Sequence, residues 1–500
     1  MKTRLTLLFA LLIFSAWGQT SLHAIDLIPG EHAIGYRHFV AYDSTRSYQR
    51  VNDWTNETGP RPILVSMWYP APETTGTPML VNDYFRILAD EEEWEHLPDE
   101  HFLNWFYYPN TPANQAHLLE RAQAVLGAEQ LTGEYPVVVY APSFRASSIE
   151  NFALCEMLAS HGYIVLSSPS RGTLTKLFEG GTVKDATTQA HDIQFLLSKV
   201  KAYTGQQAPR IATMGFSFGG LAQVLAQSQN QAIEAMVSLD GSIQYQYYKA
   251  EASPFFNVQA FDIPFLHLSQ KEIPMEVMLA DGLDTTLNHQ FSFYDQLTQA
   301  QAYHFQCLDL SHSYFSTLGV LFQTRDARQD RPDAAIMASY RTVCEYSLQF
   351  LEAYLKEDAK AQAWLTRPQP RVVLVGQKGP ADRRLGLREF HERAAAQQYQ
   401  GLDLLFEEMQ NLQSGFVLPE GGLNSLGLQL TFRPQSTEGG LRVLEFATRL
   451  HPSSANLFDS LAEAYLFAGK RSQALGAFRK SLALDSGNTN AVQRIRELTE

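Results

Sequence analysis

The sequence predicts an α/β protein with a mostly parallel central sheet and helices on both faces, followed by a small all-α domain. From about residue 33 to 365, short β-rich runs alternate with helical patterns, as in a parallel sheet covered by helices. Residues 366–384 contain few apolar residues and several Pro and Gly, which predicts a linker. Only helical patterns follow. We therefore expect one domain at 25–365 and a second at 385–500, since 500 residues exceed one ordinary core.

Eight runs are predicted to be the strands of the sheet. Two of them, PVVVYA and YIVLS, are continuously apolar, which is typical of strands buried on both faces, and we expect a helix from about 149 to 161 between them. Further helices are expected near 186–202 and 220–229. The other predicted strands are IGYRHFVAY, PILVSMWY, RIATMGF, EAMVSLD, PFLHLS and HFQCLDL.

Residues 73–132 interrupt the alternation with an acidic and aromatic stretch that lacks strand character. Two interpretations are open. The segment could be a lid or cap whose aromatic side chains shape a substrate pocket, or a surface insertion in which Trp94, Trp105 and Phe106 pack for its own stability.

The amino terminus has the order of a secretory signal peptide. A charged start at residues 1–4 precedes the apolar run LTLLFALLIFSAW and then small residues, so we predict a signal at 1–24, cleaved near Gln19 or Ile25. The run is short for the alternative, an uncleaved membrane anchor. No Cys for lipid attachment and no arginine pair accompany it. A secreted or periplasmic protein is expected, without a stable membrane span.

Charge and cysteine content exclude some classes of function. A net charge of -14 argues against nucleic acid as a partner, because phosphate binding needs a concentrated basic surface. Cys155, Cys307 and Cys344 are odd in number and widely spaced, which is neither a disulfide framework nor a metal motif. We expect buried thiols, although one pair could bridge in an oxidising compartment.

The string Gly215-Phe216-Ser217-Phe218-Gly219 carries the strongest chemical signal. A Gly-x-Ser-x-Gly string alone is weak evidence, because it also occurs by chance. The alternative is that Ser217 lies in an ordinary tight turn between a strand and a helix. Here it follows the strand RIATM and precedes the helix GGLAQVLAQSQ, which is the setting of a nucleophile elbow in the α/β-hydrolase fold. A Cβ at either flanking glycine would collide with the neighbouring strand or helix. Ser217 is therefore the candidate nucleophile.

A serine hydroxyl needs a base to take its proton and an acid to orient that base, and in this fold the acid and the base follow the serine in that order. His312 directly follows the last predicted strand, in a loop of small residues. His267 lies inside a strand and His304 begins one, so both are expected to be structural. His289 is a second, less well placed candidate.

Several carboxylates are candidates for the acid. Asp240 closes the strand EAMVSLD at its carboxyl end, where its side chain would face the serine edge of the sheet. Glu272 follows PFLHLS, a more common location of the acid in this fold, and Asp281 and Asp284 lie in the next loop. Asp240 is preferred, with Glu272 open.

Attack on a carbonyl also creates an oxyanion that needs two preorganised donors. The amide after the nucleophile and one from the loop after the third strand usually supply them. We expect the amides of Phe218 and, within Ala141-Pro142-Ser143-Phe144-Arg145, of Phe144 to be these donors, whereas Pro142 cannot donate.

The carboxyl-terminal region has the pattern of tetratricopeptide repeats. The segment NLFDSLAEAYLFAGKRSQALGAFRKSLALD, from Asn456, has the small and large residues of one helix pair. Leu426 and Gly427 lie about 35 residues earlier and indicate a degenerate preceding repeat, and a helix at 387–409 could form a third partial unit. Such repeats predict a protein partner or self-association.

Taken together, these motifs resemble the plasma-type platelet-activating factor acetylhydrolases and their bacterial dienelactone-hydrolase-like relatives. The matching segments are RPILVSMWYPA, PVVVYAPS, CEMLASHGYIVLSSPSRG, the elbow, VSLDGS and His312, over residues 30–320. In that family the acid follows the strand after the nucleophile, which favours Asp240. The resemblance implies Ser217, Asp240 and His312 as triad, no metal or organic cofactor, and a small-acyl ester substrate such as a short-chain phospholipid or acetylated glycan.

This chain departs from the family in the oxyanion loop, where Pro142-Ser143 replaces the usual His-Gly, so the pocket is expected to differ. The leading hypothesis is ester hydrolysis through an acyl-serine intermediate. One rival is a scaffold protein that binds through its repeats and carries a vestigial hydrolase. Another is the same fold acting as a peptidase, thioesterase or polyester hydrolase.

Overall fold

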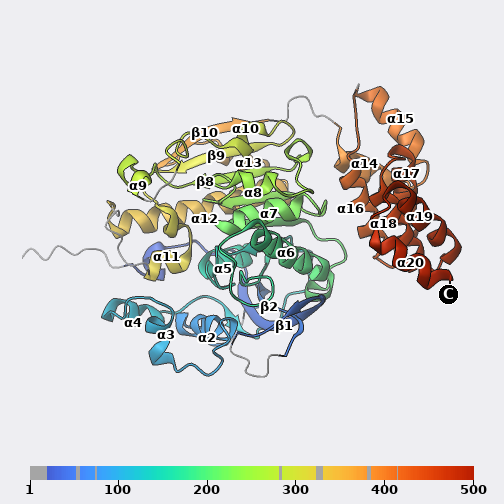
Figure 1. Cartoon of the computed structure of the whole chain (residues 1–500). Helices are drawn as coiled ribbons and strands as arrows, with labels where there is room; N and C mark the ends of the chain where they lie inside the picture. Colours follow the sequence, from blue (N-terminus) through green and yellow to red (C-terminus); the bar gives the residue numbers. More distant parts are fainter. Residues whose placement is uncertain are drawn as a thin grey trace, which may run out of the picture.

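The structure is a computed structural model that describes residues 20–51, 57–73, 76–280, 284–322, 330–379, 385–413 and 415–499. Figure 1 shows a large domain built around one sheet and a separate group of helices that contains the carboxyl terminus. Among the described residues, no helix is both long enough and apolar enough to cross a membrane.

The described part of the large domain contains a ten-stranded sheet in the order β10-β9-β8-β7-β6-β4-β5-β2-β1-β3. The six central strands, from β5 across to β9, are parallel. The antiparallel pairs lie towards the two ends of the sheet: β2 pairs with β5, β1 pairs with β2, and β10 pairs with β9. The strands are β1 (Ala33–Tyr48), β2 (Gly59–Ala71), β3 (Val125–Leu126), β4 (Val137–Ala141), β5 (Ile164–Ser167), β6 (Ile211–Phe216), β7 (Ala235–Leu239), β8 (Phe265–Ser269), β9 (Ala302–Cys307) and β10 (Val372–Lys378).

Alternate residues of the central strands enter two separate cores. Val138 of β4 packs in the core that includes α5 and α12, and its neighbours Val137 and Val139 pack in the opposite core with α6 and α7. This alternation follows from the two-residue period of a strand, and it explains why the buried strands are continuously apolar. The architecture agrees with the predicted α/β-hydrolase fold.

Helices cover both faces of this sheet (Figure 1). In the large domain they are α1 (Leu22–Ile25), α2 (Val81–Glu91), η1 (Asp99–His101), α3 (Phe102–Trp105), α4 (Pro112–Leu118), α5 (Phe152–Ser160), α6 (Val183–Thr204), α7 (Phe218–Gln227), α8 (Tyr247–Glu251), η2 (Val258–Ala260), α9 (Met275–Ala280), α10 (Ser292–Gln296), η3 (His312–Phe315), α11 (Thr317–Phe322), α12 (Asp333–Leu355) and α13 (Ala359–Leu365).

All eight predicted strands are present, as β1, β2 and β4 to β9. The expected linker at 366–384 is wrong in part, because Val372–Lys378 forms β10 and extends the sheet beyond β9. The flanks of this segment are polar and rich in Pro, so the sequence pattern did not indicate a strand. The strand forms because its backbone can hydrogen-bond to the free edge of β9. The large domain therefore extends to Lys378, and residues 380–384 lie outside the described residues.

The described residues of the insertion at 73–132 form the short helices α2, η1, α3 and α4 and the two-residue strand β3, joined by turns and loops. Its buried side chains belong to the core on the α5 and α12 side of the sheet. Phe85 of α2, for example, packs its ring 5.0 Å from the ring of Phe322 in α11. The segment is thus an integral part of the large domain.

The helical domain has a core of its own, formed by residues of α14 to α20. The expected single helix at 387–409 is wrong: it is two helices, separated at residues 397–401, where Gln398, Tyr399 and Gly401 have positive φ and end the helical path. The helices are α14 (Leu387–Ala396), α15 (Leu402–Leu412), α16 (Glu420–Thr431), α17 (Thr437–Leu450), α18 (Ala455–Phe467), α19 (Arg471–Leu484) and α20 (Thr489–Thr499).

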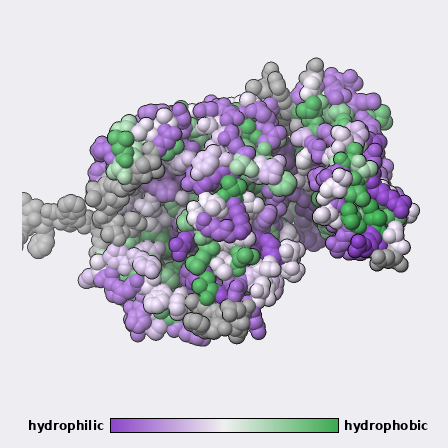
Figure 2. Space-filling view, viewed as in Figure 1, coloured by the Kyte–Doolittle hydropathy of each residue, from purple (hydrophilic) through white to green (hydrophobic). Residues whose placement is uncertain are grey.

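Helices α16 and α17 pack as one pair and α18 and α19 as another, and identification of these pairs as tetratricopeptide repeats stays a prediction. Figure 2 shows hydrophobic surface in the region of α18 and α19. Contacts with the large domain include a hydrogen bond from the Arg388 guanidinium to the Ile233 carbonyl, 2.5 Å long.

Most of the predicted signal peptide, residues 1–19, lies outside the described residues. Its last residues are packed against the large domain: Thr20 is buried beside His117, and Leu22 N–H donates to the Glu120 carboxylate. The three cysteines are buried, as expected, and are free thiols.

Candidate active site

Ser217 lies at the tip of a strained turn between β6 and α7. Its φ of 52° and ψ of -118° fall outside the regions that a side chain normally allows. The flanking positions must be glycine because a side chain would clash with the backbone. A Cβ on Gly215 would lie 2.5 Å from the backbone of Gly219, and one on Gly219 would lie 2.0 Å from the Ala141 carbonyl oxygen. This is the strand, turn and helix arrangement of a nucleophile elbow.

The structure brings the three predicted side chains together from three strand ends. Ser217 Oγ is 2.8 Å from His312 Nε2, and His312 Nδ1 is 2.5 Å from Asp240 Oδ2. Because a carboxylate can only accept, Nδ1 carries the proton and Nε2 is free to accept the serine hydroxyl hydrogen. This is the tautomer that a general base next to serine requires.

The charge on Asp240 also controls the protonation of His312. Burial favours the neutral imidazole, but the hydrogen bond and the negative charge of Asp240 outweigh burial and raise the pKa of His312 above its usual value. Asp240 itself is completely buried, and its other oxygen, Oδ1, accepts from Tyr245 OH at 2.8 Å and from Gln270 N–H at 2.9 Å. Three donors therefore hold this carboxylate in place.

The other candidate histidines have structural positions. His267 is buried in β8 and bonds to Ser238 and Gln244, and burial lowers its pKa well below the usual value. His304 is buried in β9, bonds to Ser269, and has a pKa lowered to about 4 by burial. His289 is exposed in a turn, and no hydrogen bond joins it to Ser217.

Among the described residues, neither Glu272 nor Asp284 is hydrogen-bonded to His312. Glu272 and Asp284 are exposed side chains after β8, and the hydrogen-bonded carboxylate partner of the imidazole is that of Asp240. Asp281 lies outside the described residues. The preference for Asp240 over Glu272 thus agrees with the geometry.

Sequence reasoning missed Gln270, which joins the acid to the base. Its backbone N–H binds Asp240, and its side-chain oxygen accepts from the His312 backbone N–H at 3.0 Å. Tyr245 was also missed. Gln270 directly follows β8, so its place at the active edge of the sheet was the available signal.

The two candidate oxyanion donors belong to neighbouring segments. Phe218 is the first residue of α7, so its amide N–H has no acceptor within the helix. Among the described residues, no protein acceptor binds the amide of Phe218 or that of Phe144. The two rings pack edge to face, with centroids 5.5 Å apart. Both residues line the same cavity as Ser217, and neither amide is occupied by a described protein acceptor.

Glu150 anchors the loop that carries Phe144. Its buried carboxylate accepts from Ser143 N–H at 2.9 Å, from Ser143 Oγ at 2.5 Å and from Tyr140 OH at 3.3 Å. Burial raises the pKa of Glu150 to about 7 in spite of these hydrogen bonds. Its negative charge also helps to raise the pKa of His312. Sequence reasoning missed this residue too.

Two cavities meet at His312 and Phe144. One, of about 550 Å³, is lined by Ser217 and Phe218 and continues between α8 and α9. The other, of about 810 Å³, is lined by aromatic residues of the insertion, including Trp94, and does not include Ser217. Aromatic residues of the insertion therefore line a cavity that reaches His312, and a role in shaping a substrate pocket, one of the two interpretations of this segment, stays a prediction.

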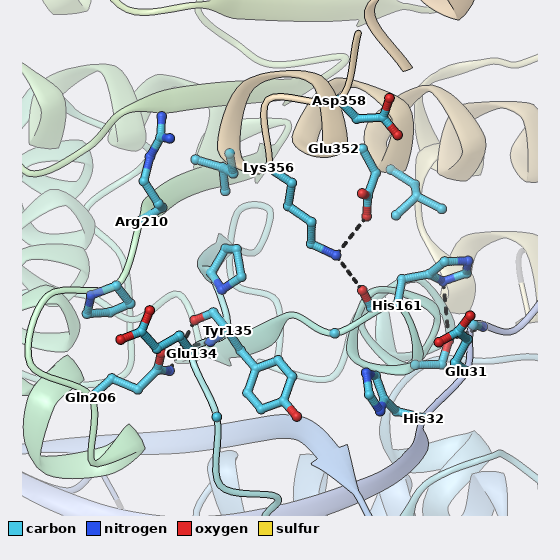
Figure 3. Close-up of a pocket in the computed structure, with 18 of the residues that line it drawn as sticks. Glu31, His32, Glu134, Tyr135, His161, Gln206, Arg210, Glu352, Lys356 and Asp358 are labelled. Carbon is cyan, nitrogen blue, oxygen red and sulfur yellow. Dashed lines mark hydrogen bonds and ion pairs between the residues drawn. The ribbon is translucent and has the colours of Figure 1, made fainter. Parts of the chain in front are cut away.

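A larger cavity, of about 1330 Å³, lies away from these residues, where the loops before β4, β5 and β6 meet the end of α12. Figure 3 shows the Lys356 ammonium in this cavity, where it donates to the Glu352 carboxylate and to the His161 carbonyl. It lies at the amino-terminal ends of the parallel strands, opposite the edge that carries the triad.

No protein-family model and no curated protein matches the sequence. Among solved structures, a ferulic acid esterase from Streptomyces cinnamoneus is similar to this chain, with a TM-score of 0.47 and 20% sequence identity. The similarity covers 70% of this chain and 98% of that one. At this low similarity, the assignment of the site depends on its own geometry.

Proposed function

We propose that this protein is a serine ester hydrolase that works through an acyl-serine intermediate. The observation that carries the proposal is the continuous hydrogen-bonded line from Ser217 Oγ through the His312 imidazole to the buried Asp240, with Ser217 on a strained elbow. A serine on a strained turn, hydrogen-bonded to an oriented imidazole, is the arrangement of an activated nucleophile.

In the proposed reaction, His312 Nε2 takes the hydroxyl proton while Ser217 Oγ attacks the ester carbonyl carbon. The Phe218 and Phe144 amides stabilise the negative charge on the carbonyl oxygen. His312 then gives its proton to the leaving alcohol oxygen, and Asp240 stabilises the imidazolium in between. Water, activated by the same imidazole, releases the acid from Ser217. The residues need no metal or organic cofactor for these steps.

We further propose esters of small acyl groups as substrates, with short-chain phospholipids as the candidates that the family resemblance implies. The protein is proposed to be exported. Since Thr20 and Leu22 pack against the large domain, cleavage near Gln19 preserves these contacts, whereas cleavage before Ile25 removes them. The mass of the mature secreted chain tests this point.

The decisive experiment measures hydrolysis of p-nitrophenyl acetate by the wild-type protein and by Ser217→Ala. The variant is expected to lose nearly all turnover, by about 10⁴-fold or more, and to keep its unfolding temperature, because one hydroxyl is removed from a folded turn. Retained activity in the variant would sink the assignment.

Labelling with a fluorophosphonate probe separates the enzyme from a scaffold protein. An activated Ser217 is expected to react with the probe in the wild type and not in Ser217→Ala. Unreactive Ser217 in folded protein would favour the scaffold, in which the helical domain binds a partner. A panel of matched ester, thioester and amide substrates then distinguishes an esterase from a thioesterase or a peptidase.

A further inference from the structure

The two cavities beside His312 can hold different parts of an ester substrate. This inference rests on the proposed hydrolase reaction. In the acyl intermediate the acyl group is bonded to Ser217 Oγ, so it must occupy a cavity that Ser217 lines. Only the 550 Å³ cavity of the two contains both Ser217 and Phe218. The leaving alcohol passes His312, which borders both cavities. We therefore infer that the 550 Å³ cavity receives the acyl group.

Lys249 of α8 places a buried ammonium in this acyl cavity. Only 9% of the residue is exposed, and Nζ donates to the Gly181 carbonyl at 2.5 Å and to Gln246 Oε1 at 2.8 Å. Both acceptors are neutral. Among the described residues, no carboxylate lies within ion-pair distance of Nζ.

The negative charge that opposes the effect of burial on Lys249 belongs to Asp185, whose carboxylate is already engaged. Its carboxylate accepts from Thr182 N–H at 2.8 Å, from Thr182 Oγ1 at 3.0 Å and from Glu179 N–H at 3.1 Å, which fixes the start of α6. Burial lowers the pKa of Lys249, and the charge of Asp185 opposes this effect only in part. The Lys249 charge is therefore incompletely compensated.

A buried ammonium has three donors, and leaving one unpaired in a region of low polarity is costly. Two donors of Lys249 are used, and the third has no acceptor among the described residues. An anion in the cavity would satisfy both the free donor and the charge, with a strong charge-assisted hydrogen bond.

The surroundings leave space for such an anion. Gly180 and Gly181 line the cavity with φ of 97° and 73°, and a Cβ built on Gly180 meets no atom within 4 Å. The Lys249 Nζ lies 6.0 Å from the centre of the Phe218 ring, so the ammonium is near the side chain of a residue that lines the same cavity as Ser217. Two further charged side chains line the cavity: Lys271, which pairs with Asp330, and the exposed Glu272, whose charge solvent screens.

We propose that Lys249 makes the acyl site selective for acyl groups that carry a carboxylate, so that the preferred substrates are monoesters of dicarboxylic acids. The ester carbonyl carbon lies at Ser217 Oγ, and the distal carboxylate binds the Lys249 ammonium. Hydrolysis consumes one water and yields the dicarboxylate, the alcohol and one proton.

The test compares kcat/KM for p-nitrophenyl monoesters of dicarboxylic acids of five to eight carbons with kcat/KM for neutral p-nitrophenyl esters of the same chain length, at pH 8. Spontaneous hydrolysis is subtracted for each ester. For at least one length, the wild type is expected to prefer the carboxylate ester by tenfold or more. In Lys249→Met this ratio is expected to fall below twofold.

Lys271→Met is the matched control, because it removes the same charge from the same cavity at an ion-paired position. Its ratio is expected to stay within threefold of the wild-type ratio. A second measurement avoids any folding defect of the variants: hexanedioate is expected to inhibit the wild type at a concentration at least tenfold lower than hexanoate.

Failure of the proposed carboxylate site and failure of the proposed hydrolase give different results. If the wild type hydrolyses neutral esters through Ser217 but shows no preference for any carboxylate ester and no stronger inhibition by hexanedioate, the carboxylate site is overturned and the proposed hydrolase stands. A preference that Lys271→Met abolishes and Lys249→Met keeps overturns the role of Lys249. If Ser217→Ala keeps its activity, the proposed hydrolase itself fails.

Discussion

Replacement of Asp240 by Asn should disable the base without unfolding the protein. Two donors, Tyr245 OH and Gln270 N–H, meet at Oδ1 of Asp240. The amide oxygen of Asn is expected to take this position, since it accepts both, and its NH₂ group then faces His312 Nδ1. The imidazole must shift its proton to Nε2 in order to accept from that NH₂. Nε2 would then donate to Ser217 instead of accepting from it.

The expected loss of kcat/KM is about 10⁴-fold, the size seen when a serine hydrolase base is locked in the wrong tautomer. At ~1.36 kcal/mol per tenfold change, this corresponds to about 5.4 kcal/mol of transition-state stabilisation. The loss of folding stability should be much smaller, about 1–2 kcal/mol, because two of the three hydrogen bonds of Asp240 survive.

Turnover of p-nitrophenyl acetate at pH 8, measured beside the thermal unfolding curve, tests this reasoning. Glu272→Gln provides the comparison, since Glu272 is the other carboxylate that the sequence offered and does not bind His312. It is expected to lose less than about tenfold. A folded Asp240→Asn that keeps more than a tenth of wild-type activity refutes the tautomer argument.

Three further predictions follow from the same geometry. Because the pKa of His312 is raised and the base must be neutral, kcat/KM should fall as the pH decreases through a pKa above 6.5, which a pH-rate profile measures. Glu150→Ala should release the loop that carries Phe144 and lower kcat by about 10–100-fold with a smaller change in KM; an unchanged kcat would contradict its positioning role. Gly219→Ala should lower the melting temperature by more than about 5 °C because its Cβ meets backbone at 2.0 Å, whereas Gly476→Ala, with open space in α19, should leave it equal or higher.

Where the signal was local, the sequence predicted the strands and pointed to the candidate site. Eight apolar runs became strands, and the glycines around Ser217 fixed the elbow through a collision that any Cβ would cause. His312 was identifiable by its place after the last parallel strand. Such features depend on a few consecutive residues, whose periodicity and volume the sequence records directly.

Features that depend on a partner far along the chain were decided by the tertiary structure. β10 exists because its backbone finds the open edge of β9, and the polar composition of its flanks gave no indication of that edge. The helix expected at 387–409 is interrupted at Gln398, Tyr399 and Gly401, which have positive φ. The sequence pattern did not indicate this break.

The same division applies within the site. The order of the chain allowed Asp240 or Glu272 as the acid, and only the packing of β7 beside β8 brought Asp240 to His312. Gln270, Glu150 and the buried charge of Lys249 also emerged from the structure alone. The physical reason is that a hydrogen bond or a buried charge depends on distance and solvent exclusion, and both arise only when separate segments pack together.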